Sequence, residues 1–294
     1  MLALCSFILC ERDASAILIT GTLSPAAIEA ALFAGGGMGV DLSSVSVTVS
    51  GHTMPGVSAG TYTNFTGTYG IGPGVIISSG NAVDYGDGMN TSPGFTTDYG
   101  VMATAAQEAL LDPITGGMND HFDATQIDIA FDMLPGFADV FFRVTFGSEE
   151  YAEFQASPFI DAFGMFVNGT NVAFVDGAPI NVDHENMGTA PGTELDGVLG
   201  SADTGAPPLT PAPAVPPLFH TFTSPVMAMG NTLTFIIADS GDGDLDSTAY
   251  ISQLGGSPPP PPGQVIPEPA SLAVWSVLGM LGAGIQWRRR KKTA

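Results

Sequence analysis

Positive charge is nearly absent from this chain outside its two ends. Only 7 of its 294 residues are lysine or arginine, against 29 aspartates and glutamates. Arg143 is the one basic residue between residues 17 and 264, a stretch that holds every acidic residue except Glu11, Asp13 and Glu268. Nucleic acid and anionic lipid are not attracted to such a region, so both are excluded as its partners. The charge suits divalent cations. Solubility or salt adaptation of an exposed surface is the other interpretation, and composition leaves both open.

Cysteine is absent beyond the tenth residue. Cys5 and Cys10 fall in residues 1–16, which have the apolar run and the A-x-A-like cleavage site, here Ala14 to Ala16, of a secretory leader. The basic start of such a leader is missing, so we expect the true start codon to lie upstream. Once the leader is removed, the protein contains no cysteine and cannot be stabilised by disulfides, even in an oxidising compartment.

Tryptophan occurs only in the last twenty residues, at Trp275 and Trp287. Both lie in an uncharged run, residues 270–287, which at about 1.5 Å per residue is long enough to cross a thin bilayer as a transmembrane helix. A basic tail, 288–294, follows the run, and a proline-rich linker, 256–269, precedes it. The basic cluster would keep the C-terminus in the cytoplasm and everything upstream outside it.

The linker ends in Pro267, Glu268 and Pro269, directly before the apolar run. Motif, span and basic cluster in this order resemble the PEP-CTERM sorting signal of exopolysaccharide-producing Gram-negative bacteria. The resemblance implies an exosortase-type processing enzyme as a partner. It also implies a precursor anchored in the inner membrane and a mature protein at the cell surface or in the extracellular matrix. A plain single-pass anchor is the alternative.

The region between leader and linker, residues 17–255, has the composition of one turn-rich globular domain. Charged residues make up 12% of the chain and apolar ones 45%, with 38 glycines. Apolar and polar residues alternate with the period of half-buried strands. We predict an all-β fold, an antiparallel, jelly-roll-like β-sandwich with one or two short helices, at Ser24 to Ala34 and Ala103 to Leu111. Asn168-Gly169 predicts a hairpin. The predicted strands are Val45 to Val49, Val75 to Ser79, Thr125 to Met133, Val140 to Phe146, Ala162 to Val167, Asn171 to Val175, Thr232 to Ala238 and Thr248 to Leu254.

Several short motifs in this region resemble the choice-of-anchor L domain. They are Ile76 to Ala82, the block Ser148-Glu149-Glu150-Tyr151, the block around Asp161 and the closing stretch from Ile237 to Ile251. The resemblance covers roughly residues 17–255. It implies a surface module found with varied C-terminal anchors, and it brings no established catalytic residues.

The strongest chemical signal is an acidic loop with Asp239, Asp242, Asp244 and Asp246. Carboxylates at alternating positions in a glycine-bearing loop can converge on Ca²⁺, which takes six to eight oxygen ligands. We therefore predict calcium as a cofactor, with an acidic, solvated turn as the alternative. The loop is not an EF-hand, because Ser247 stands where that motif needs glycine. Residues 81–90, with Asp84 and Asp87, are a weaker site of the same type.

The candidate catalytic motifs in the sequence are incomplete. Gly56 to Gly60 matches the G-x-S-x-G pattern but lacks the strand before it and the helix after it, so a turn is expected there. His184-Glu185 lacks the second histidine of a zinc protease, and the four histidines have no metal-ligand spacing. The acidic residues that could supply a glycosidase pair are Glu149, Glu150, Glu153 and Asp161, whose separations sequence does not give.

These observations predict an exported, non-catalytic protein with a structural or adhesive role at the cell surface or in the polysaccharide matrix. A calcium-assisted carbohydrate-binding module is the alternative, with exopolysaccharide as the candidate partner. An extracellular glycan hydrolase is a distant third. A row of exposed aromatic side chains would favour the second, and an open cleft with two nearby carboxylates the third.

Overall fold

The computed structural model describes residues 17–86, 94–201 and 212–257. The predicted leader, the sorting motif, the apolar run 270–287 and the basic tail all lie outside the described residues. Within the described part of the chain, no helix is long and apolar enough to cross a membrane.

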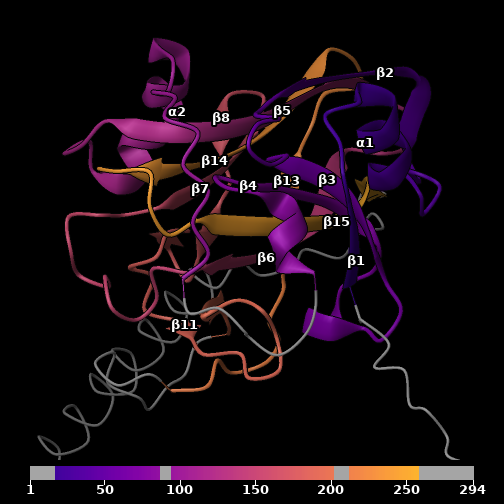
Figure 1. The fold of residues 1–294 in the computed structure, drawn as a ribbon. Helices are drawn as coiled ribbons and strands as arrows, with labels where there is room; N and C mark the ends of the chain where they lie inside the picture. The colour runs from indigo at the N-terminus through magenta and orange to yellow at the C-terminus, as the bar shows by residue number, and fades with distance from the viewer. Residues whose placement is uncertain (1–16, 87–93, 202–211, 258–294) are drawn as a thin grey trace, which may run out of the picture. The chain divides into compact units, whose positions relative to one another are not determined.

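Two antiparallel sheets contain most of the described strands (Figure 1). The eight-stranded sheet has the order β1 (Ile17–Gly21), β3 (Ala59–Asn64), β4 (Gly74–Ser78), β15 (Ser247–Ser257), β6 (Asp139–Ser148), β12 (Gly197–Leu199), β11 (Met187–Gly188), and β13 (His220–Pro225) also pairs with β6. The five-stranded sheet has the order β2 (Val40–Ser50), β5 (His121–Met133), β14 (Asn231–Ser240), β7 (Ala162–Val167), β8 (Thr170–Asn171). A separate pair joins β9 (Phe174–Val175) to β10 (Ala178–Pro179).

The predicted antiparallel, mostly β class is confirmed, while the jelly-roll-like connectivity stays a prediction. The hairpin is also confirmed: Asn168 and Gly169 have φ values of 49° and 79° and join β7 to β8. The strand predicted from Asn171 to Val175 is wrong in its continuity, because two short strands replace it. The Asn171 side chain accepts a hydrogen bond from the Ala173 amide at 2.9 Å, and this local turn ends β8.

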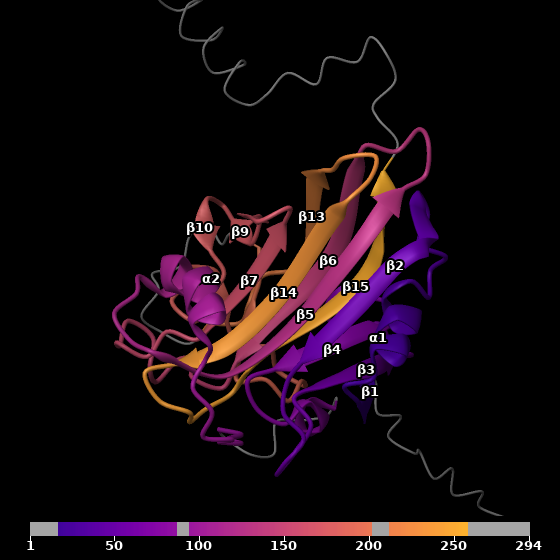
Figure 2. The same ribbon diagram turned by 90° about the horizontal axis from the view of Figure 1, so that it is seen from above.

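The main core lies between the two sheets, which Figure 2 shows as two layers. Phe142 of β6 meets Phe235 of β14 edge to face, with ring centroids 5.2 Å apart. Phe146 of β6 stacks on Phe163 of β7 at 6.3 Å. The alternating apolar positions of these strands therefore face each other across the layers, as their period of two requires.

Two α-helices cover parts of the sheets. The first, α1 (Pro25–Leu32), begins with proline in its first turn and buries Ile28 and Leu32 in the main core. The second, α2 (Ala105–Thr115), begins at a Thr104–Gln107 capping box. It packs Leu111 and Ile114 on the outer face of the five-stranded sheet (Figure 2). Both predicted helices are confirmed, although α2 begins and ends later than expected, with Gly116 at φ 85° as the C-cap after Thr115.

Candidate functional site: a buried carboxylate cluster at one end of the core

The apolar core between the sheets ends in a layer of oxygen-bearing side chains. The inward-facing stripes of several strands run through Ile77, Phe146, Phe163, Ile237 and Ala249. Two residues from each of these, towards the same end of the core, the inward-facing residue is polar and at most 1% exposed. These residues are Ser79, Ser148, Asp161, Asp239 and Ser247. Sequence alternation therefore continues past the core, but apolar residues give way to hydroxyls and carboxylates.

Six carboxylates gather in this region, and we call them the carboxylate cluster: Asp123, Glu149, Glu150, Asp161, Asp239 and Asp246, each at most 2% exposed. Strand register brings them together. Ala238 pairs with Ala162, which sets Asp239 of β14 opposite Asp161 at the start of β7. Ser247 pairs with Ser148 in the other sheet, and its hydroxyl crosses to Asp161 Oδ2 at 2.9 Å.

A segment without regular secondary structure, residues 94–101, donates alternate backbone amides to the cluster. The amide of Phe95 donates to Glu149 Oε2 at 3.3 Å, and that of Thr97 to Asp246 Oδ1 at 3.0 Å. The amides of Tyr99 and Val101 donate to the two oxygens of Asp123 at 2.8 and 2.9 Å. Three of the six carboxylates thus satisfy backbone donors and hold this segment against the end of the core.

Asp239 and Glu150 are satisfied far less well. Neither carboxylate oxygen of Asp239 has a hydrogen-bond partner among the described residues, although the Ser79 hydroxyl lies close enough to counter part of the rise in its pKa. Glu150 Oε2 is also without a partner, while its carboxylate interacts with the Asp161 amide. Buried polar atoms are nearly always hydrogen-bonded, so oxygens left without a partner point to a group that would engage them.

Burial makes ionisation of these groups unfavourable. It raises the pKa of Glu149 and of Glu150 to about 8 and that of Asp246 to about 7. The pKa values of Asp161 and Asp239 lie well above the ordinary range, first because of burial and then because Glu150 and Asp161, respectively, are close by. In these five carboxylates, burial and neighbouring negative charges both disfavour the ionised form.

No basic side chain compensates for this charge within the described residues. The Arg143 guanidinium lies over the Phe219 ring, 4.7 Å from its centroid. Arg143 is in the middle of β6, whereas only the last residue of that strand, Ser148, belongs to the polar layer beside the cluster. The one ion pair of the described chain joins His121 to Glu108, which is not a cluster member.

The predicted site residues fall into two groups. Asp239 and Asp246 of the acidic loop point into the cluster, together with Glu149, Glu150 and Asp161 of the family motifs. Asp244 is exposed, and its amide donates to Asp242 Oδ1 at 3.3 Å in a local turn. Register explains the division, because Asp239 ends the inward stripe of β14 whereas Asp242 and Asp244 lie in the connection to β15. Asp84, of the weaker predicted site, lies near enough to raise the pKa of Asp246; Asp87 lies outside the described residues.

The remaining motif residues have structural surroundings. Tyr151 packs in the main core beyond the cluster, and Glu153 lies in the turn that follows. Ser58 of the G-x-S-x-G pattern stands just before β3, not before a helix, and accepts hydrogen bonds from the His52 amide and the Thr125 hydroxyl. His184 is buried, and its ring nitrogens interact with the Val175 carbonyl and the Asn186 amide.

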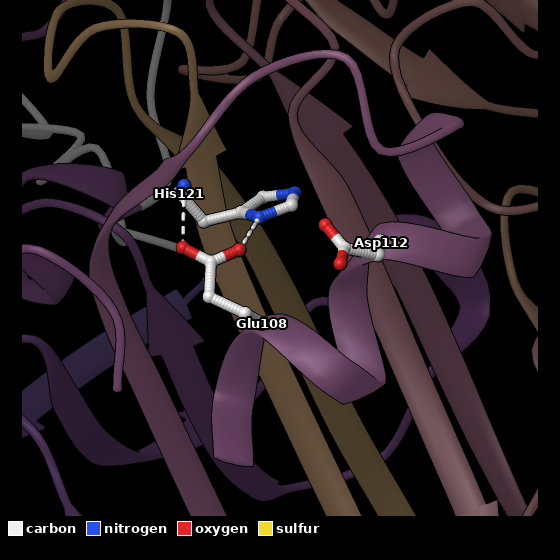
Figure 3. A group of neighbouring side chains, drawn as sticks. All are labelled: Glu108, Asp112 and His121. Carbon is white, nitrogen blue, oxygen red and sulfur yellow. Dashed lines mark hydrogen bonds and ion pairs between the residues drawn. The ribbon is translucent and has the colours of Figure 1, made fainter. Parts of the chain in front are cut away.

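Sequence spacing missed a second group, Glu108, Asp112 and His121, shown in Figure 3. Among the described residues it is the one set of three Asp, Glu or His ligand atoms within 4.8 Å of one another. Glu108 and Asp112 are one helical turn apart on α2, and His121 begins β5. The signal that could have found them is this i, i+4 carboxylate pair ahead of a strand that starts with histidine.

Hydrogen bonds already engage this histidine on both sides. Glu108 accepts from the His121 amide at 2.9 Å and contacts its Nδ1 at 2.5 Å, while Nε2 lies 3.1 Å from the Thr115 hydroxyl. A hollow of about 560 Å³ opens beside Glu108 and Asp112 and is lined also by Asp120. The group could hold a transition metal through nitrogen and oxygen ligands, but its present contacts fasten α2 to β5.

Comparison with protein families identifies the domain. The model of the choice-of-anchor L domain matches residues 22–196, more than half of the chain, so the chain belongs to the choice-of-anchor L family. The match ends before β13, β14 and β15, so Asp239 and Asp246 lie beyond it, although the resemblance was expected to reach residue 255. No curated protein and no solved structure matches the chain. Membership in this family indicates an exported, surface-anchored protein.

Proposed function

We propose that this protein is exported, sorted through its C-terminal signal and retained outside the cell as a structural or adhesive module without catalytic activity. The observation that carries the proposal is the choice-of-anchor L domain at residues 22–196. Its position ahead of a proline-rich linker, a Pro-Glu-Pro motif, an apolar run and a basic tail fits a surface module joined to a sorting signal.

If the protein is sorted in this way, the mature chain should have a defined C-terminus. If an exosortase-type enzyme recognises Pro267, Glu268 and Pro269, mass spectrometry of the mature protein should find a C-terminus near Pro269. Replacing Glu268 with alanine should then leave the longer precursor in the inner membrane. Intact chain ending at Ala294 in the envelope of an exosortase-positive host would instead support a permanent single-pass anchor.

The burial of the acidic residues supports a non-catalytic role. Glu149, Glu150 and Asp161 are at most 2% exposed, so a sugar ring has no direct access to a pair of them. Ser58, the one candidate nucleophile, has a hydroxyl and a backbone amide as its partners, not a histidine ring. We expect the purified protein to release no sugars or peptides from polysaccharide or protein substrates. Turnover abolished by Glu150→Gln would refute the proposal.

The exposed aromatics favour a structural role over carbohydrate binding. Phe65, Phe154 and Phe174 are the exposed aromatic rings among the described residues, and they come from separate segments, after β3, after β6 and in β9, so no single strand presents them as a row. Glycan-array binding of the mature protein, with and without calcium, separates the two roles. Saturable binding to one glycan class would favour the carbohydrate-binding module.

A further inference from the structure

We propose that Asp239 and Asp161 bind one calcium ion at the buried end of the core, and that this ion stabilises the fold at neutral pH. The site concerns the stability of the domain and does not depend on how the protein is sorted. It differs from an exposed calcium loop, because its ligands come from β14 and from the residue directly before β7, which strand pairing places side by side in the buried end of the core.

The unpartnered oxygens supply the first argument. Asp239 is 0% exposed, yet both of its oxygens are without a hydrogen-bond partner among the described residues. Glu150 Oε2 is in the same condition. By contrast, Asp161 accepts from the Ser240 amide at 3.2 Å and the Ser247 hydroxyl at 2.9 Å, which orients its carboxylate beside Asp239. A charged, desolvated group without a partner is costly, so the arrangement indicates a bound cation.

The ligand chemistry supplies the second argument. Every candidate ligand atom is oxygen: the two carboxylates and the hydroxyls of Ser79, directly after β4, and Ser247, at the start of β15. Hard divalent cations prefer such ligands, whereas zinc and softer metals favour histidine and cysteine. Among the described residues, no three carboxylate oxygens of the cluster lie within 4.8 Å of one another. The shell must therefore include hydroxyls, main-chain carbonyls or waters, which Ca²⁺ accepts readily and in flexible geometry.

Charge balance supplies the third argument. The described chain offers no basic side chain near the cluster, and Arg143 is engaged with Phe219. Six buried carboxylates lie together in this region, so those that are charged repel one another without solvent to screen them. A divalent ion removes this repulsion, while Mg²⁺ is a poorer match because it needs near-ideal octahedral geometry and retains its waters.

Thermal unfolding of the purified protein at pH 8 tests the site. Calcium added to the chelated protein, at a concentration about a hundredfold above Kd, should raise the Tm by roughly 5–10 °C. Asp239→Asn keeps the shape of the side chain and removes its charge. We expect this variant to lose the calcium response and to have a higher Tm than the wild type in chelator, because one repelling carboxylate is gone.

Asp244→Asn is the matched control, since Asp244 belongs to the same acidic loop but is exposed. It should keep the full calcium response. Loss of the response in Asp244→Asn with retention in Asp239→Asn would move the site to the loop and overturn the proposal. Equal Tm shifts with calcium and magnesium at matched ionic strength would also overturn it, because they would indicate screening of an acidic surface.

Terbium luminescence gives a readout that does not depend on folding stability. Tyr85 donates to Asp246 Oδ2 at 3.3 Å, which places a tyrosine ring beside the cluster as the sensitiser. Excitation of tyrosine should produce terbium emission that calcium displaces with one-to-one stoichiometry. Emission of equal strength in Asp239→Asn would contradict the assignment. If Asp239→Asn does not fold, Asp161→Asn gives the same test.

Discussion

At the scale of single residues, Gly80 shows how closely the cluster is packed. A Cβ atom added at Gly80 would lie 1.6 Å from Asp246 Oδ2, far inside van der Waals contact. Asp246 cannot move aside cheaply, because its oxygens are held by the Thr97 amide and the Tyr85 hydroxyl. Gly80→Ala should therefore lower the free energy of unfolding by about 3 kcal/mol or more, at the upper end of overpacking costs. Urea unfolding of the purified protein measures it.

Gly35→Ala is the matched control for this substitution. Gly35 is exposed after α1, and an added Cβ there meets no atom within 4 Å. The change should stay within about 0.5 kcal/mol of the wild type. If the two alanine variants had similar free energies of unfolding, the Asp246 carboxylate would be free to shift. The cluster would then be less tightly packed than its hydrogen bonds indicate.

At the scale of elements, Glu108 fastens α2 to β5. It accepts a hydrogen bond from the His121 amide and contacts the His121 ring. Glu108→Ala leaves both groups without this partner at a partly buried position, so we expect a loss of about 1–3 kcal/mol in the free energy of unfolding. Faster hydrogen exchange of α2 amides should accompany the loss, because the helix would separate from the sheet more easily.

Asp112→Ala serves as the control on the same helix. Asp112 is exposed and lies in the last turn of α2, where a negative charge opposes the helix dipole, so its removal should be neutral or slightly stabilising. If zinc raises the Tm of the wild type and Asp112→Ala abolishes that rise, the group in Figure 3 is a metal site and not only a structural contact between α2 and β5.

The strands that sequence predicted are those with a clear period of two or a long apolar run, such as β5 and β6. Sequence missed six of the described strands. Of these, β10, β11 and β12 are only two or three residues long, and the other three were missed for identifiable reasons. β1 follows directly on the leader, and β13 lies among prolines. β3 contains one large apolar side chain, Tyr62, so its pattern carries little periodic signal. Their places in the sheet come from pairing, of β1 with β3, of β3 with β4 and of β13 with β6, which local pattern does not reveal.

The candidate site was predicted in parts and not as a whole. Sequence singled out Asp161, Glu150 and Asp239 in three separate motifs, far apart along the chain. Their meeting depends on the register of β14 on β7 and on the packing of one sheet over the other. Alternation alone could not separate Asp239 from Asp244, because that requires knowing where β14 ends and its connection to β15 begins.

At the scale of the whole molecule, the protein buries acidic side chains that most folds keep at the surface. The formal net charge is −22, and six carboxylates of the described chain are buried at one end of the core. Such groups oppose folding when they ionise, whereas exposed ones are solvated and screened. The pH at which the protein is most stable should therefore depend on whether a cation occupies the cluster.

The sign of this dependence follows from the raised pKa values. Unfolded carboxyls titrate near pH 4, whereas burial raises the pKa of Glu149 and Glu150 to about 8 and that of Asp246 to about 7. Between these limits the folded state binds more protons than the unfolded state, so the free energy of unfolding decreases as pH rises. Stability from these groups is present in full below about pH 4 and is lost as pH passes through 7 and 8.

We therefore expect the Tm of the chelated protein to fall steadily from pH 5 to pH 8.5. Calcium binds the deprotonated carboxylates, so its stabilising effect should be small at pH 5 and grow towards pH 8.5, which flattens the curve. Asp239→Asn should reduce the slope in chelator, while Asp120→Asn, at an exposed position, should leave it unchanged. Differential scanning calorimetry across this range measures all three curves. A Tm of the chelated wild type that rises with pH would show that the buried carboxylates are stabilised in their charged form by a group other than a divalent ion.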